Sequence, residues 1–253
     1  MGKLNDINNF SVVLLSAGTG SRLGALGKAI PKSLIKIKNE TLLYRLVKFF
    51  LKKKLRELNI IVGYKHKMIF NELKAIKNIK INYIYSKNFI SNGSCYSWYL
   101  FKKYWEIKKK PILMFHTDLI FDEKFADNII YSKIKNIIGI RISKKNKLKK
   151  NSFVVRVNKK RMFAKEIGLK KNVKSFYGEV ICINKFSSEV MNKIFNYMKI
   201  YFKNYGKSST WEFMLNNFIN DYKKIKINVL KDQKFKWVNI NSPKDLTYAK
   251  KLF

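Results

Sequence analysis

The chain has 253 residues, and its hydrophobic content of 47% suffices for one large domain or two small ones with a real core. Its 54 Lys and Arg residues against 16 Asp and Glu give a formal net charge of +38, which alone would suggest nucleic acid as a partner. Only six of these cations are arginine, the residue that nucleic-acid readers favour for bidentate contacts. A composition biased toward residues with A/T-rich codons explains the charge better, although the field still attracts anionic substrates.

The two cysteines, Cys95 and Cys182, lie in separate segments and give neither a disulfide framework nor a metal-binding spacing. The opening MGKLNDINNF lacks the apolar core of a signal peptide, and no uncharged apolar run reaches the roughly 18 residues that cross a membrane. The sequence therefore predicts a cytoplasmic protein without a membrane span, and nucleic acid is not an expected partner.

Short apolar runs alternate with helical patterns in the first half of the chain. Strands are predicted at 10–16, 58–64, 79–86 and 110–121. Helices are predicted at 40–54, 66–76 and 93–105, the last with Ser91 and Asn92 as N-cap residues. This alternation is typical of a parallel sheet that helices cover on both faces.

Strands predominate farther along the chain. They are predicted at 136–143, 152–158, 162–168, 177–184, 225–230 and 235–240. Helices are predicted at 187–205, 209–220 and 242–253, the last with a Ser cap and Pro in its first turn. No linker divides the chain. We expect an α/β fold: residues 1–253 form a single domain with a mixed, mostly parallel central sheet, a Rossmann-like first half and an insertion-rich second half.

The segment LSAGTGSRLGALGKAIPKSL, residues 15–34, places a glycine-rich loop directly after the first predicted strand. Glycines let backbone N–H groups approach an anion closely and adopt positive φ at little cost. The spacing fits neither the Walker A motif nor G-x-G-x-x-G. A structural turn and a phosphate-binding loop are both compatible with the glycines alone.

The order of the segment resembles the signature of the nucleotidyltransferase superfamily that joins a nucleotide to a sugar phosphate or an alcohol phosphate. In that pattern L-A-A-G-x-G-S-R-L follows a strand and P-K-x-L comes about ten residues later, as LSAGTGSRL and PKSL do here. The resemblance implies that Arg22 grips the leaving pyrophosphate and that Lys32 lies between donor and acceptor. It also implies a triphosphate-binding loop made of Ala17, Gly18, Thr19, Gly20 and Ser21.

Four later segments, in the same order, resemble bacterial choline-phosphate cytidylyltransferases and phosphonate cytidylyltransferases: SNGSCYSWYL (91–100), YGEVICINKFSSE (177–189), STWEFMLN (209–216) and WVNINSPKDL (237–246). The resemblance covers about residues 11–253. It implies a nucleotide-binding half at about 10–121 and an acceptor-binding half at about 122–253. It further implies in-line transfer of a cytidylyl group from CTP to a small phosphorylated alcohol, first of all phosphocholine, giving a CDP-alcohol and pyrophosphate.

The same resemblance implies Mg²⁺ as cofactor, with Asp118 as one ligand. The second metal acid of the family maps to Asn241, whose amide offers a carbonyl oxygen but no charge. Metal binding is then weaker, shared with Glu179, or carried mainly by substrate phosphates. His116, two residues before Asp118, is expected to be a buried, hydrogen-bonded histidine.

For the nucleotide base, the resemblance points to Asn92 and then Ser97, and Asn92 can serve as a helix cap at the same time. A choline-like ammonium needs aromatic faces and an acid. The candidates for this acceptor site are Tyr96, Tyr177, Glu179, Trp211 and Glu212.

Three alternatives stay open: a sugar-1-phosphate nucleotidyltransferase that uses UTP, GTP or dTTP, a catalytically degenerate homologue, and a nucleic-acid-binding homologue. The expected partners are a nucleoside triphosphate and a small phosphorylated acceptor. A homodimer is compatible with the sequence, which does not fix the oligomeric state.

Overall fold

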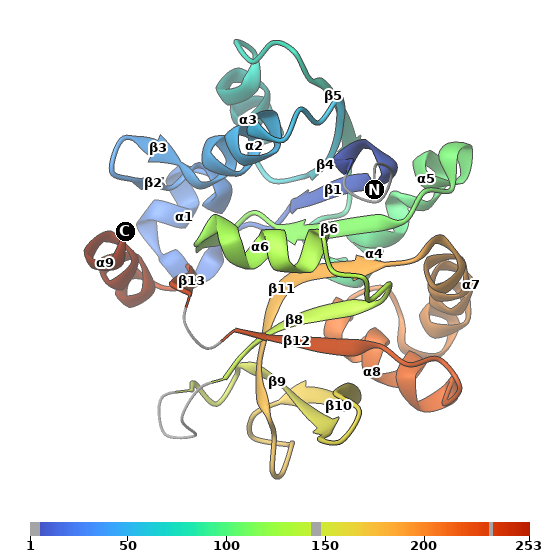
Figure 1. Cartoon of the computed structure of the whole chain (residues 1–253). Coiled ribbons are helices and arrows are strands. Elements are labelled where there is room, and N and C mark those ends of the chain that lie inside the picture. The colour runs from blue at the N-terminus through green and yellow to red at the C-terminus, as the bar shows by residue number, and fades with distance from the viewer. Residues whose placement is uncertain (1–5, 143–147, 233–234) are drawn as a thin grey trace.

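The computed structural model describes residues 6–142, 148–232 and 235–253, and a nine-stranded mixed sheet runs through its middle (Figure 1). The strand order across this sheet is β5-β4-β1-β6-β11-β8-β12-β10-β9. The bounds are β1 (Ser11–Ser16), β4 (Glu57–Val62), β5 (Lys80–Tyr85), β6 (Ile112–His116), β8 (Ile137–Arg141), β9 (Phe153–Asn158), β10 (Phe163–Leu169), β11 (Gly178–Phe186) and β12 (Asn228–Asp232).

Strand direction changes at the middle of the sheet. Strand β1 pairs in parallel with β4 and β6, and β4 pairs in parallel with β5, so the first half of the chain builds a parallel sheet. Strand β11 then joins β6 antiparallel and connects the strands of the second half, among which β8 and β12 are parallel. The sheet is mixed, as the sequence predicts, but it is not mostly parallel: among its described strands four pairings are parallel and five are antiparallel. Strands from both halves of the chain share it.

Helices cover both faces of the sheet (Figure 1). Their bounds are α1 (Ala25–Ala29), α2 (Leu42–Lys52), α3 (His66–Leu73), α4 (Ser94–Leu100), α5 (Lys102–Lys108), α6 (Glu123–Ile130), α7 (Ser188–Tyr205), α8 (Trp211–Asp221) and α9 (Pro243–Leu252). The 3-10 helices are η1 (Ile7–Asn9), η2 (Ser21–Leu23) and η3 (Lys32–Leu34). In the described residues, no helix is long and apolar enough to cross a membrane.

The residues of β1 alternate between the two hydrophobic cores, as the two-residue period of a strand requires. Val13 belongs to the core that contains Trp98 of α4 and side chains of α7 and α8. Val12 and Leu14 belong to the core that contains Phe50 of α2 and side chains of α3 and α6. This explains why β1 is a continuous apolar run, since both of its faces are buried.

The structure corrects three element predictions. The helix expected at 93–105 is two helices, because α4 ends before Phe101 and α5 starts after it. Neither Ser91 nor Asn92 caps it: the N-cap residue of α4 is Gly93, with no side-chain cap. The strand expected at 110–121 is interrupted after His116, and α6 lies where no helix was predicted. The expected strand end at residue 143 lies outside the described residues.

That interruption places the functional residues. A two-residue turn, Thr117–Asp118, separates β6 from β7 (Leu119–Phe121), and β7 pairs antiparallel with β13 (Trp237–Asn239) in a separate two-stranded sheet. The amide of Ile240 donates to the carbonyl oxygen of Asp118 at 2.9 Å. The end of β13 is thereby fixed beside the turn. A further two-stranded sheet pairs β2 (Lys36–Ile37) with β3 (Glu40–Thr41).

Candidate active site

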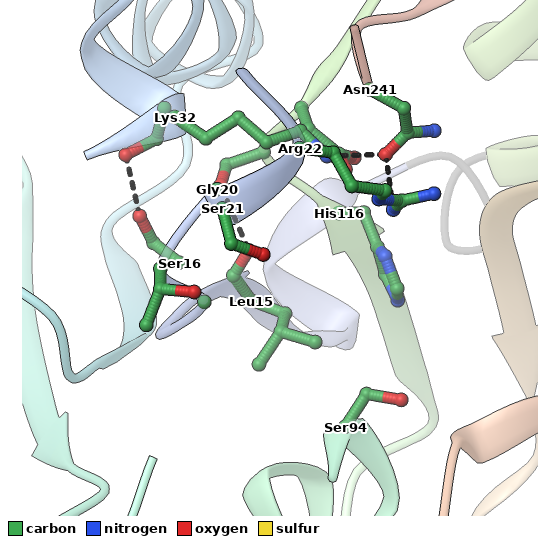
Figure 2. Close-up of a pocket in the computed structure, with 14 residues that line it drawn as sticks. Leu15, Ser16, Gly20, Ser21, Arg22, Lys32, Ser94, His116 and Asn241 are labelled. Carbon is green, nitrogen blue, oxygen red and sulfur yellow. Dashed lines mark hydrogen bonds and ion pairs between the residues drawn. The ribbon is translucent and has the colours of Figure 1, made fainter. Parts of the chain in front are cut away.

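A pocket of about 330 Å³ lies where β1 and β6 end, at the carboxyl edge of the parallel strands (Figure 2). Ligands bind at this edge in open α/β sheets. Its walls come from the loop after β1, from η3, from the end of β6 and from the segment after β13. The lining residues are Leu15, Ser16, Gly18, Thr19, Gly20, Ser21, Arg22, Lys32, Ser33, Ser94, His116, Thr117, Asp118 and Asn241.

The glycine loop is compact and leaves its amides available. Gly20 has φ of +67° and directly precedes η2, and a Cβ on Gly27 would lie 2.2 Å from the Gly20 oxygen. Within the described parts of the chain, the amides of Gly18, Thr19 and Gly20 have no hydrogen-bond partner. Free amides in a loop that leads into a helical turn suit an anion.

Two cations meet at Asn241 in the same pocket. Lys32 donates from Nζ to a carboxylate oxygen of Asp118 and, at 2.6 Å, to Oδ1 of Asn241. Arg22 donates from its guanidinium to the same Asn241 oxygen at 2.8 Å. Asn241 is held in turn, because its backbone amide donates to Asp245 at 3.1 Å. The Oδ1 atom of Asn241 therefore accepts hydrogen bonds from both Arg22 and Lys32, the two cations of the glycine-loop motif.

The carboxyl of Asp118 stays charged although it is mostly buried. Burial raises its pKa, but the charge of Lys32, and then that of His116, outweigh this and leave the pKa below its ordinary value. Its second oxygen, Oδ1, is buried and has no partner among the described residues. An unpartnered carboxylate oxygen in a pocket is suited to a cation.

The structure brings only part of the predicted site together. Arg22, Lys32, Asp118, Asn241 and most of the predicted loop line one pocket. Eight candidates do not line it: Ala17, Asn92, Tyr96, Ser97, Tyr177, Glu179, Trp211 and Glu212. Of these, Ala17, Ser97, Trp211 and Glu212 are buried.

Glu179, one of the eight, has its pKa raised by burial. A hydrogen bond with Ser152 and the charges of Arg141 and Lys149 oppose this shift without cancelling it.

Sequence reasoning missed several lining residues. Ser94 was not singled out, yet its hydroxyl accepts from the amide of Trp211 at 2.9 Å and so ties the start of α8 to the pocket. Its contact partner is 117 residues away, and no local pattern signals such a contact. His116 was expected to be hydrogen-bonded, and this was wrong: its Nε2 is buried and, within the described residues, has no partner.

Comparison with known proteins fits this geometry. A family model described as nucleotidyl transferase matches residues 11–161, whereas no curated protein sequence matches the chain. One similar solved structure is a CTP:phosphocholine cytidylyltransferase from Streptococcus pneumoniae, with 18% sequence identity, a TM-score of 0.75, and coverage of 96% of this chain and 98% of that one. A putative glucose-1-phosphate thymidylyltransferase from Bacillus anthracis has 17% identity, a TM-score of 0.78 and coverage of 96% and 94%. The inositol-1-phosphate CTP transferase of T. maritima has 16% identity, a TM-score of 0.76 and coverage of 96% and 94%. At this identity they show the fold, which confirms the predicted α/β class.

Proposed function

The chain belongs to the nucleotidyl transferase family, and on that premise we propose that it transfers a cytidylyl group from CTP to a small phosphorylated alcohol, with pyrophosphate as the second product. The family assignment itself supports a nucleotidyltransferase that acts on a phosphorylated small molecule. CTP and phosphocholine are our choice within that class, because the motif order along the whole chain resembles choline-phosphate cytidylyltransferases.

One observation carries the proposal: Arg22 and Lys32 converge on Asn241 in the same pocket as a loop with unpaired amides. In the proposed reaction, a phosphate oxygen of the acceptor attacks the α-phosphorus in line. The bond between the α-phosphorus and the bridging oxygen breaks, and pyrophosphate leaves with both electrons of that bond. Proteins accelerate such a transfer mainly by positioning and by neutralising charge, which loop amides and two cations can do.

Within this mechanism we assign the triphosphate to the loop, residues 17–21. Arg22 binds the leaving pyrophosphate through its planar guanidinium, which matches two phosphate oxygens at once. Lys32 lies between the two reacting phosphates, and its ion pair with Asp118 orients it before substrate arrives. Each of these groups reduces the electrostatic repulsion between the acceptor phosphate and the triphosphate.

The residues present also fit the Mg²⁺ that we propose as cofactor. Asp118 supplies a buried, unpartnered carboxylate oxygen, and Mg²⁺ needs only one or two carboxylates besides water and substrate phosphates. Bound there, Mg²⁺ would neutralise charge on the phosphates of the nucleotide. The oxygen of Asn241 already accepts from two cations, so Asn241 is the weaker candidate ligand.

The base and acceptor sites remain proposals that rest on the family resemblance. We assign the cytosine to the segment around Asn92 and Ser97, which directly flanks the pocket residue Ser94. We assign an ammonium group of the acceptor to Tyr177 and Glu179. A half-buried carboxylate with a raised pKa gains from a neighbouring cation.

A pyrophosphate-release screen tests the function. Four nucleotides are combined with phosphocholine, phosphoethanolamine, an aminoalkyl phosphonate, inositol phosphate and glucose-1-phosphate, each with and without Mg²⁺. We expect release with CTP and a phosphorylated alcohol. Release only with a sugar-1-phosphate and UTP, GTP or dTTP would favour a sugar-1-phosphate nucleotidyltransferase. Similar solved structures of a putative thymidylyltransferase and a UDP-glucose pyrophosphorylase are the reason to test this alternative.

A further inference from the structure

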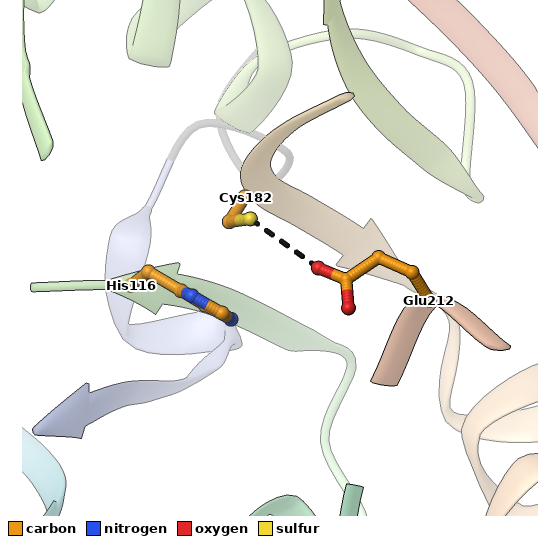
Figure 3. A group of neighbouring side chains, drawn as sticks. All are labelled: His116, Cys182 and Glu212. Carbon is orange, nitrogen blue, oxygen red and sulfur yellow. Dashed lines mark hydrogen bonds between the residues drawn. The ribbon is translucent and has the colours of Figure 1, made fainter. Parts of the chain in front are cut away.

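Three side chains that can bind a metal meet behind the pocket wall (Figure 3). They come from three different elements: His116 from the end of β6, Cys182 from β11 and Glu212 from the first turn of α8. One ligand atom of each lies within 4.8 Å of the other two. Cys182 and Glu212 are only 8% and 6% exposed, so the group is part of the protein interior.

The polar atoms of this cluster are poorly satisfied by the protein. The hydrogen-bond partner found for the Glu212 carboxylate is the Cys182 thiol, a weak donor, at 3.6 Å. No Lys or Arg in the described residues forms an ion pair with Glu212, and the Nε2 of His116 is buried without a partner. A buried carboxylate with only a weak donor, beside a buried imidazole nitrogen without a partner, destabilises a fold unless something binds them.

We propose that His116, Cys182 and Glu212 bind a divalent transition-metal ion, Zn²⁺ in preference to Mg²⁺. Imidazole nitrogen and thiolate sulfur are the ligands that Zn²⁺ favours, whereas Mg²⁺ requires oxygen. His116 also lines the pocket of the proposed active site, so the cluster adjoins that pocket. None of its three residues is Asp118, whose carboxylate oxygen we propose as the Mg²⁺ ligand.

The geometry of the cluster is close to that of a bound ion. Tetrahedral angles with Zn–S of about 2.3 Å and Zn–O of about 2.1 Å put sulfur and oxygen roughly 3.6 Å apart. The Cys182 sulfur and the Glu212 oxygen are 3.6 Å apart. Because the widest ligand separation is at most 4.8 Å, closing the cluster on an ion requires side-chain shifts on the order of 1 Å.

Metal binding would replace a proton. Burial, and then the charge of Glu212, raise the pKa of the Cys182 thiol, so without an ion it stays protonated and donates to Glu212. As the sulfur–metal bond forms, the S–H bond breaks and the proton leaves to water; no oxidation state changes. The ion then neutralises the buried thiolate and carboxylate and joins α8 to two strands of the sheet.

Titration with Co²⁺, a spectroscopic substitute for Zn²⁺, tests the proposal. We expect about one equivalent to bind the wild type and to produce the absorption band of thiolate-to-metal charge transfer. The band disappears in Cys182→Ser and persists in Cys95→Ser, the matched control, since Cys95 is the other buried free cysteine. Glu212→Gln keeps the thiol and weakens Co²⁺ binding by ~10-fold or more, so the test does not depend on the folding of Cys182→Ser.

Thermal unfolding gives a second measurement. At one fixed Zn²⁺ concentration the Tm rises more for the wild type and for Cys95→Ser than for Glu212→Gln, because the weakened site binds less of the ion in the folded state. A charge-transfer band that persists in Cys182→Ser, or none in the wild type, would overturn the proposal. A third outcome would also overturn it: Co²⁺ gives no band, and phosphocholine raises the Tm of the wild type but not that of Glu212→Gln. The cluster would then bind the acceptor and not a metal ion.

Discussion

At the scale of single residues, the spacing of Arg22 and Lys32 from the glycine loop brings both cations to Asn241 in the proposed site. Lys32 is one of many lysines, but its ammonium bonds both Asp118 and Asn241. We predict that Lys32→Ala lowers kcat by ~100-fold or more with an unchanged fold, because a charge that neutralises the reacting phosphates is lost. Steady-state pyrophosphate release measures the effect. Lys36→Ala, an exposed lysine on β2, is the control, and near-normal turnover of Lys32→Ala would contradict the role.

Asn241 offers a charge change in the opposite direction. In Asn241→Asp a carboxylate faces Arg22 and Lys32 and adds a second acid beside Asp118. We predict that Mg²⁺ or Mn²⁺ binds this variant ~10-fold more tightly, since carboxylates are better ligands for hard cations than an amide oxygen. Titration of Mn²⁺ followed by paramagnetic resonance gives the affinity without turnover. Asn151→Asp adds the same charge at an exposed position, and an equal gain there would contradict the site-specific explanation.

The ion pair of Asp118 predicts a pH dependence of stability. Its pKa is lower in the folded protein than its ordinary value of 3.8, so the stabilisation is complete above that value and is lost as pH falls through the lowered pKa. We expect Asp118→Asn to lower the free energy of unfolding by about 1–3 kcal/mol near neutral pH, and the difference from wild type to shrink below about pH 4. Urea unfolding at several pH values measures it. A difference that grows on acidification would contradict the assignment.

The sequence identifies these residues because a motif of fixed spacing includes them. Arg22 and Lys32 follow the loop at set distances, and Asp118 follows an apolar strand. The same reasoning cannot find the contact of Ser94 with Trp211 or the missing partner of His116. Both depend on packing between elements far apart in the chain, which no local pattern encodes.

At the scale of elements, the periodic segments are predictable and their interruptions are not. The strand and helix predicted at 10–16 and 187–205 correspond to β1 and α7 because their apolar residues repeat with the right period. Nothing local marks the break of the helix at Phe101, an apolar residue in a helical pattern and buried in the core. The pairing of β7 with β13 likewise joins distant segments, yet it is what fixes Asn241 beside Asp118.

One glycine fixes how two elements meet beside the pocket. A Cβ on Gly93, the N-cap of α4, would lie 2.0 Å from the oxygen of Ser209, in the segment before α8. We predict that Gly93→Ala destabilises the protein by about 1–3 kcal/mol, because backbone must shift to admit the methyl group. Thermal unfolding measures the change. Gly18→Ala is the control, since nothing lies within 4 Å of its added Cβ, and equal loss in both variants would contradict this packing explanation.

At the scale of the whole molecule, composition and the alternation of strands and helices predict the α/β class. The order and direction of the strands in the sheet depend instead on pairing between segments far apart in the chain. Strand β11 lies between β6 and β8 and pairs antiparallel with both, so the sheet is mixed and not parallel throughout. Its apolar residues fit either direction of pairing, so the sequence leaves that direction open. The family match confirms the resemblance, while the base and the acceptor remain proposals.

The net charge of +38 gives the last prediction. A basic surface concentrates anions near the pocket, and salt screens this attraction because the Debye length shortens from about 14 Å to about 4 Å between 0.05 and 0.5 M. We therefore expect the KM for the nucleotide to rise ~3–10-fold over that range while kcat changes less. A neutral osmolyte at matched osmolality is the control. A KM that is independent of salt would mean that the pocket's own cations, Arg22 and Lys32, bind the triphosphate unaided, and that the lysine-rich surface contributes nothing to substrate capture.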